Sequence, residues 1–218
     1  MSETYRVPWP LKVFDLDGVI TSRDTMAHLC GELLRRRPTR LIPAVALLVR
    51  RRFANSAQAA QRCDAALVQL SLRGMSLAGY EGAAERTVRR FVSDVRSLRP
   101  ALIEELERCA AVGPVVVATA SEVMLARRLL KELGVRGVEV IGSELAATPH
   151  GLQFGLHNVG ERKLVSLLER RLPLAGATFY TDSASDLPVA AACGQTVYVG
   201  GSRREFELFE NASWWAGD

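Results

Sequence analysis

Two closely spaced aspartates and a third far along the chain have the residue types of a metal site. Asp15 and Asp17 lie at the end of the apolar segment LKVFDL, a predicted strand, and Gly18 follows them. Two carboxylates at positions i and i+2, next to a glycine that permits a tight turn, can place one on a metal while the other reaches past it. Asp182, after another predicted strand, can complete a site of oxygen ligands, which suits Mg²⁺.

Other polar groups in the chain suit a phosphate. Lys163 lies at the start of a predicted helix, where its ammonium can screen a carboxylate and hold a phosphate oxygen. Thr119 and Ala120 follow a predicted strand and precede a predicted helix, and the Thr119 hydroxyl and the first N–H groups of that helix can bind further oxygens. Clustered carboxylates repel one another, so such a site should bind a cation and then phosphate.

The elements that must position these residues alternate along the second half of the chain. Apolar segments at 115–118, 138–141, 177–181 and 196–199 predict strands, and helices are expected at 100–112, 121–133, 161–172 and 186–193. ELAAT and LQFGL, around His150-Gly151, predict a hairpin. The alternation predicts an α/β fold with a Rossmann-like, mostly parallel sheet, whose ligands bind at the carboxyl ends of the strands.

The segment 22–99 differs from this pattern. It has no convincing strand, is rich in Ala, Leu, Arg and Gln, and shows helical spacing of its apolar residues. We therefore expect two domains: a catalytic core from 1–21 and 100–218, and a helical cap from 22–99. Residues 23–99 contain 15 arginines and six acidic residues, a net charge of +9, whereas the whole chain has a net charge of +4.

Four segments in order, FDLDGV, VVVATAS, the lysine of GERK, and YTDSASD, resemble the four motifs of the haloacid dehalogenase-like superfamily. The resemblance covers the core from Leu11 to about Val199. It implies a magnesium-dependent phosphatase in which Asp15 attacks phosphorus and forms an aspartyl-phosphate, while Asp17 protonates the leaving oxygen and later activates water. Covalent catalysis of this kind divides one difficult displacement into two easier ones.

The resemblance also implies the other roles. The metal would be held by the Asp15 side chain, the Asp17 backbone carbonyl and Asp182. Thr119 and Lys163 would bind phosphate. Asp186 would orient the waters of the metal or Lys163, although aspartate is also favoured as an N-cap of the helix that follows. Val19 departs from the family pattern, which commonly has threonine or serine there.

A helical cap after the first motif resembles the phosphoserine-phosphatase-like branch, and such a cap would close over the site and exclude water. The expected substrate is a small phosphorylated metabolite such as phosphoserine. Asp24 lies near the position where that branch has an acidic residue that binds the amine of the substrate. The same aspartyl-phosphate would also permit phosphotransfer to an acceptor other than water.

The segment RRRPTRLIPAVALLVRRR allows two interpretations. The simpler one is a buried cap helix with solvated arginines at its ends. The alternative is a helix at a membrane surface that attracts anionic lipid, as in a phosphatidylglycerophosphate-like phosphatase, which the segment also resembles. A basic binding module is a third possibility for the segment, but nucleic acid is the weaker partner because no aromatic stacking pattern accompanies the arginines.

The remaining expectation concerns location. The N-terminal residues have no apolar stretch of the kind found in a secretory signal, and the longest apolar run, LIPAVALLV, is shorter than a membrane span of ~20 residues. The four cysteines form no CxxC pair. We expect a cytoplasmic enzyme, with peripheral membrane contact in the alternative interpretation.

Overall fold

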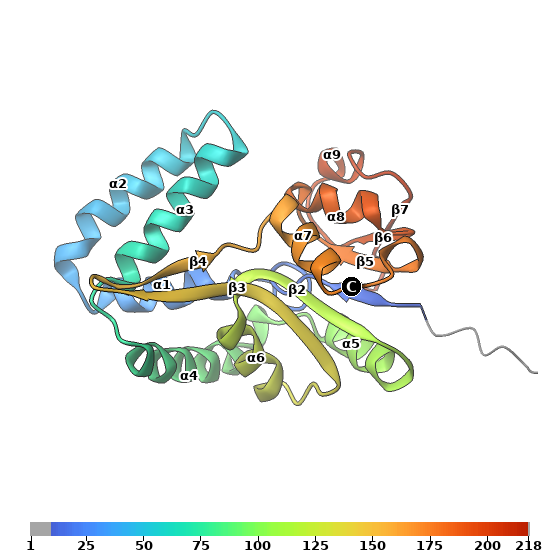
Figure 1. Ribbon diagram of the computed structural model, residues 1–218, viewed down its shortest axis with the longest axis horizontal. Helices are drawn as coiled ribbons and strands as arrows, with labels where there is room; N and C mark the ends of the chain where they lie inside the picture. The colour runs from blue at the N-terminus through green and yellow to red at the C-terminus, as the bar shows by residue number, and fades with distance from the viewer. Residues whose placement is uncertain (1–9, 218) are drawn as a thin grey trace, which may run out of the picture.

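A seven-stranded sheet organises residues 10–217, the part of the chain that this computed structural model describes (Figure 1). The strand order is β4-β3-β2-β1-β5-β6-β7, and every neighbouring pair is parallel except β3 and β4. The strands are β1 (Lys12–Phe14), β2 (Val115–Glu122), β3 (Val138–Thr148), β4 (Gly151–Leu156), β5 (Thr178–Thr181), β6 (Gln195–Tyr198) and β7 (Ala212–Trp214). This topology confirms the predicted α/β class.

Helices cover both faces of the sheet, with α5 and α6 on one face and α7, α8 and α9 on the other (Figure 1). The helices are α1 (Thr25–Arg35), α2 (Leu41–Arg52), α3 (Ala57–Leu72), α4 (Leu77–Ser93), α5 (Pro100–Val112), α6 (Val123–Glu132), α7 (Glu161–Glu169), α8 (Leu187–Ala192) and α9 (Arg203–Phe206). Consecutive strand residues point to opposite faces, so Val13 and Phe14 belong to two separate apolar clusters.

The sheet places the carboxyl ends of β1 and β5 next to each other. From β1 the chain continues to β2 and β3 on one side of the sheet, whereas β5, β6 and β7 build the other side. Loops leaving strands on either side of such a switch point diverge, and the crevice between them is the usual ligand site of an open parallel sheet. Asp15 and Asp182 are the first residues after these two strands.

The first four helices fall into two pairs with different neighbours (Figure 1). Helix α4 packs along α6, and α1 contacts both α4 and α6, so this pair lies against the sheet domain. Tyr80 on α4 is fully buried and donates a hydrogen bond to Glu122 at 2.7 Å. Helices α2 and α3 pack on each other and project away from the sheet.

The predicted hairpin is present, with residues 144–148 of β3 paired to β4, and β3 also includes the strand predicted at 138–141, so that the two form one continuous strand. Strand β3 runs from the sheet to the turn after α3, where Arg73 and Gly151 form a backbone bridge. Gly151 has a φ of +113°, and a Cβ there would lie 2.3 Å from the backbone nitrogen of Gly74. A side chain at position 151 would therefore push the hairpin away from α3.

Helix α2 contradicts the simpler interpretation of its sequence. Ala44 is its buried residue, and apolar side chains such as Ile42 and Val49 face solvent. The helix has a single helical neighbour of substance, α3, so it has no core in which to bury its remaining apolar face. Within residues 10–217, no helix is both long enough and apolar enough to cross a bilayer.

Candidate active site

Lys163 and two carboxylates form a buried ionic cluster at the carboxyl edge of the sheet. The Lys163 ammonium donates to Asp15 Oδ2 at 3.0 Å and forms an ion pair with Asp186 at 2.8 Å. The Asp186 carboxylate also accepts from Thr181 Oγ1 at 2.9 Å, at the end of β5. All three charged residues are buried. The structure thus brings together three of the predicted site residues and fixes the lysine between two anions.

Asp17 turns its carboxylate the other way, toward β2 and α1. Ser121 Oγ donates to it at 2.6 Å, and the backbone N–H of Thr25 donates at 2.8 Å. Thr25 and Ser121 also share a hydrogen bond at 2.9 Å. The carboxylate is therefore held at the point where the first residue of α1 meets the end of β2.

The first and the last motif approach each other closely at Gly18. Its φ is +82°, and a Cβ on it would lie 1.8 Å from Asp182 Oδ2. The Asp182 carboxylate can therefore occupy its position only because residue 18 has no side chain. This geometry places Asp182 directly beside the Asp15-Asp17 turn, as the sequence predicted.

Burial and negative charge raise the pKa values of these carboxyls. Burial raises the pKa of Asp17 to about 7, with a further contribution from the charge of Asp24. Burial and Asp186 raise the pKa of Asp182 to about 6. The pKa of Asp15 lies well above its ordinary value because burial and two neighbouring carboxylates outweigh the opposing charge of Lys163. The site thus favours protons, or an equivalent cation, over bare carboxylates.

The metal predicted for this site fits the oxygen groups that face the turn. Three or more His, Cys, Asp or Glu side chains do not gather as a metal cage anywhere in residues 10–217. The oxygen groups that a metal could use at the turn are the carboxylates of Asp15 and Asp182, whose charges act on one another. Mg²⁺ in proteins is usually bound by one or two carboxylates, and water and substrate phosphate complete its coordination shell.

Two buried polar residues that sequence reasoning missed hold Thr119 and Ala120, in the irregular last part of β2. Asn158 donates through its side-chain amide to the carbonyl of Thr119 at 3.0 Å. Ser143 donates to the carbonyl of Ala120 at 2.6 Å and accepts from the backbone N–H of Asn158 at 2.9 Å. Both residues are fully buried. They come from β3 and from the segment after β4, and neither belongs to a motif that marks it in the sequence.

The helix after Thr119 begins at Val123, two residues later than predicted, and its first N–H groups have a partner within the protein. The sequence predicts that the first N–H groups of α6 face the ligand, but the Glu122 carboxylate caps the helix and accepts from Met124 and Leu125 at 3.0 and 2.9 Å. Their donors are therefore already satisfied. Thr119 is buried beside the site, where its hydroxyl accepts from the N–H of Ser121 at 3.0 Å.

The remaining predicted residues have structural partners. Asp24 is the N-cap of α1, where it accepts from the N–H of Ala27 at 2.7 Å, and its side chain is solvent-exposed close to Asp17. Asp186 precedes α8 but makes no capping hydrogen bond, since its carboxylate faces Lys163. Val19 is fully buried in the apolar core, and Thr21 lies within 3.3 Å of the Asp17 carboxylate.

The sequence matches the haloacid dehalogenase-like hydrolase family over residues 13–191. This range contains every site residue described above at the carboxyl edge of the sheet, and it covers most of the chain. The chain therefore belongs to the haloacid dehalogenase-like hydrolases, and it is an enzyme of that class. A comparison with curated protein sequences gives no significant match.

Solved structures share the fold at low sequence identity. A Bordetella pertussis protein of unknown function is 21% identical with a TM-score of 0.58, over 93% of this chain and 95% of the other. A phosphoserine phosphohydrolase-like protein from Francisella tularensis is 11% identical with a TM-score of 0.65, over 94% of each chain. A phosphoserine phosphatase with an analogue of its phospho-aspartyl intermediate is 14% identical with a TM-score of 0.54, over 94% of this chain and 93% of the other.

Proposed function

We propose that the protein is a magnesium-dependent phosphomonoester hydrolase that works through an aspartyl-phosphate on Asp15. The observation that supports this best is the pairing of Asp15 with Lys163 at 3.0 Å, beside a second carboxylate, Asp17, that is held on separate hydrogen bonds. One carboxylate is thus kept close to a cation, and the other is held by hydrogen bonds from Ser121 and the Thr25 N–H. Two carboxyls with different environments suit a nucleophile and an acid/base.

In the first half of the reaction, an Asp15 oxygen attacks phosphorus and the bond to the ester oxygen breaks. The proton of Asp17 goes to that leaving oxygen, so an alcohol departs. In the second half, Asp17 takes a proton from a water molecule that attacks the aspartyl-phosphate, and inorganic phosphate leaves while the Asp15 carboxylate is regenerated. The pKa of Asp17, about 7, allows both proton transfers near neutral pH.

The other residues bind and orient the phosphoryl group. Lys163 provides a fixed positive charge beside Asp15, and Asp186 holds that ammonium in place. Thr119 and Ala120 lie at the end of β2, where their carbonyl groups are held by Asn158 and Ser143. Mg²⁺, when bound by Asp15, Asp182 and the Asp17 carbonyl, would neutralise charge on the phosphoryl oxygens and on the nucleophile.

The test is turnover of an aryl phosphate in the presence of Mg²⁺. We expect Asp15→Asn to lower kcat by at least about 10³-fold, because the amide cannot form the covalent intermediate. Asp94→Asn is the matched control, since Asp94 is an exposed aspartate in the cap segment and asparagine retains its capping hydrogen bond. Equal turnover in Asp15→Asn and in the wild type would remove Asp15 as the nucleophile.

The favoured substrate class is a small phosphorylated metabolite such as phosphoserine. The fold shared with a phosphoserine phosphatase supports this choice, and Asp24 provides an exposed carboxylate near Asp17 that can pair with an amine. If so, Asp24→Asn should raise KM for phosphoserine but leave KM for an amine-free phosphate ester unchanged. In this scheme α2 and α3 would act as the cap over the substrate, and the 22–99 segment as the cap domain.

A second candidate function is hydrolysis of a lipid phosphate at a membrane surface. The exposed apolar face of α2 favours it, because a large exposed apolar patch marks a contact with a membrane or another macromolecule. Comparing turnover of phosphoserine with that of phosphatidylglycerophosphate in vesicles separates the two candidates. Analysis of the products in the presence of alcohol acceptors would reveal any phosphotransfer.

A further inference from the structure

Helix α2 presents a continuous apolar face to solvent. Ile42 is 82% exposed and Phe53, directly after the helix, is 75% exposed. The other large apolar side chains of this face are between 40% and 56% exposed: Leu41, Val45, Leu48 and Val49. We call these six residues the α2 face. No other helix in residues 10–217 exposes as many large apolar side chains.

The spacing of these residues gathers them on one side of the helix. Ile42, Val45, Val49 and Phe53 follow at intervals of three and four residues, which places them along one line of an α-helix. The opposite side of α2 packs on α3, and Figure 1 shows α2 as the outermost helix, with α3 between it and the rest of the molecule. The α2 face is therefore directed away from the protein.

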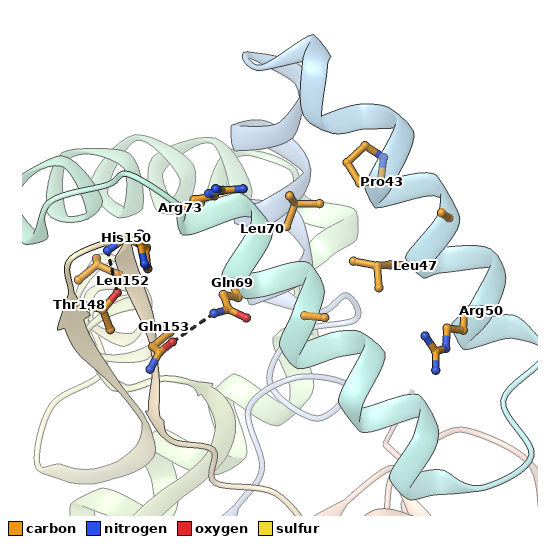
Figure 2. Close-up of a pocket in the computed structure, with 12 residues that line it drawn as sticks. Pro43, Leu47, Arg50, Gln69, Leu70, Arg73, Thr148, His150, Leu152 and Gln153 are labelled. Carbon is orange, nitrogen blue, oxygen red and sulfur yellow. Dashed lines mark hydrogen bonds between the residues drawn. The ribbon is translucent and has the colours of Figure 1, made fainter.

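A cavity on the inner side of α2 does not compete for this face. It measures about 590 Å³ and lies among α2, α3 and the β3–β4 hairpin. Figure 2 shows Pro43 and Leu47 on its α2 side, and these residues alternate with those of the α2 face along the helix. Any ligand of this cavity would leave the α2 face exposed.

The charges around the α2 face are of one sign. Between Glu32 and Asp64 the sequence has eight arginines and no acidic residue. Arg35 and Arg36, at the end of α1, precede α2 by a few residues, and Arg50, Arg51 and Arg52 form its last turn; all five are exposed. Arg51 is paired with Asp64 and Arg50 lines the inner cavity, so Arg52 is the last-turn arginine that helical spacing places on the α2 face. A cationic border around an apolar face fits a partner whose surface is anionic above an apolar interior.

A second copy of this chain would be a poor occupant. Two α2 faces packed on each other, in either direction, would bring arginines of one copy close to arginines of the other. Like charges in contact across an interface oppose association. An anionic bilayer has no such conflict, since its phosphates attract arginine and its acyl region accepts the apolar side chains.

We propose that the α2 face docks on the surface of an anionic lipid bilayer. Ile42, Val49 and Phe53 enter the boundary between headgroups and acyl chains, and the arginines at the helix ends extend to lipid phosphates. The helix lies in the plane of the surface, since it is too short to span the membrane. Docking uses residues distinct from the catalytic carboxylates, so it does not depend on the proposed hydrolysis.

The experiment is flotation of the purified full-length protein with vesicles of phosphatidylcholine, alone or with phosphatidylglycerol added. We expect binding that requires phosphatidylglycerol and weakens as salt is raised. The variant Asp15→Asn should bind as the wild type does. A failure of catalysis would thus be distinguishable from a failure of docking, because vesicle binding is measured without turnover.

Two sets of variants test the α2 face. Replacing Ile42, Val45 and Val49 together with glutamine should lower vesicle affinity by about tenfold or more, because their apolar area no longer enters the lipid. The matched control replaces three exposed apolar residues on α5 and α7 with glutamine: Val112, Val165 and Leu168. Arg52→Gln, at the arginine that helical spacing places on the α2 face, should also weaken binding by about fivefold, whereas Arg204→Gln on α9 should not.

Three results would overturn the proposal. The first is wild-type protein that shows no preference for anionic vesicles. The second is equal affinity in the α2-face variant and its matched control. The third is a wild-type dimer, measured by light scattering, that the α2-face variant converts to a monomer, because the second copy would then be the occupant of the face. Circular dichroism and melting of each variant confirm that it is folded.

Discussion

At the residue scale, a comparison of Gly18 with Gly134 can separate the effect of backbone strain from that of a steric contact. Both Gly18, at φ +82°, and Gly134, at φ +81°, adopt the left-handed conformation, but a Cβ at position 134 would meet no atom within 4 Å. Gly18→Ala and Gly134→Ala should therefore share a strain of about 1–2 kcal/mol. Gly18→Ala should in addition displace Asp182 and lower kcat/KM by about 10²-fold.

The measurement is kcat/KM together with the Mg²⁺ concentration that gives half-maximal rate, for both variants. Gly134→Ala should retain the wild-type values and lose stability alone. If both variants kept wild-type kinetics, then the contact between residue 18 and Asp182 would have no part in catalysis.

Asp17 makes a second prediction at this scale, on pH. Burial raises its pKa to about 7, so the protonated form, which donates to the leaving oxygen in the proposed mechanism, declines above that pH. For an alkyl phosphate, kcat/KM should fall about tenfold per pH unit above about pH 7. An aryl phosphate, whose leaving oxygen needs less help from an acid, should show a smaller fall. If kcat/KM fell with pH as steeply in Asp17→Asn as in the wild type, for both substrates, the role of Asp17 as the acid would be contradicted.

The site residues that the sequence predicts are those in short, ordered motifs. Asp15 and Lys163 are 148 positions apart, yet each motif follows a strand or begins a helix, and parallel strands deliver such positions to one edge. Ser143 and Asn158 escape prediction because their function is to satisfy carbonyl groups in one particular loop. Only the packed geometry shows which buried carbonyls need a donor.

At the scale of elements, the loop-like, irregular end of β2 at Thr119 and Ala120 depends on those two residues. Asn158→Ala removes the donor to the carbonyls of Thr119 and Ile141, which are buried, at a cost in stability of about 1–3 kcal/mol. The loop should also lose its position, so inorganic phosphate should inhibit about tenfold more weakly. The inhibition constant and a denaturation curve measure the two effects.

Thr196→Val is the matched control for Asn158→Ala. Thr196 is also buried, but its hydroxyl has no hydrogen-bond partner in the described part of the chain. Its replacement should leave both stability and phosphate inhibition nearly unchanged. Unaltered phosphate inhibition in Asn158→Ala would show that the loop keeps its position without this hydrogen bond.

The sequence predicts the elements themselves with uneven success. The strands of the core agree to within a few residues, because continuous apolar runs bounded by polar residues are specific signals. The apolar content of helix α2 is that of a buried core helix, and its single neighbour becomes evident only in three dimensions. Strand β7 escapes prediction, since its three residues, ASW, carry no periodic pattern.

At the scale of the whole molecule, the crowded carboxylates predict how stability depends on pH and metal. The pKa values of Asp17 and Asp182 rise from an ordinary value of 3.8 to about 7 and about 6 in the folded protein, and that of Asp15 rises as well. The folded state therefore binds more protons than the unfolded state. Without metal, this contribution to stability is complete below about pH 4 and is lost as pH rises toward about 7.

Thermal unfolding in EDTA and in Mg²⁺ checks this prediction. At pH 8, saturating Mg²⁺ should raise Tm by roughly 5–10 °C, because the ion binds the folded state alone. Asp182→Asn should reduce this increase, since one of the two carboxylates is removed. An equal increase in that variant would place the cation elsewhere.

Strand β3 connects two distant parts of the molecule. Near its middle Ser143 holds the carbonyl of Ala120, and at its far end the hairpin turn meets Arg73 after α3. The ladder of β3 and β4 joins these two points, so a tilt of α3 would reach the end of β2 through the hairpin. If α2 and α3 cover the substrate as proposed, then their opening and the release of phosphate would be one coupled motion rather than two successive events.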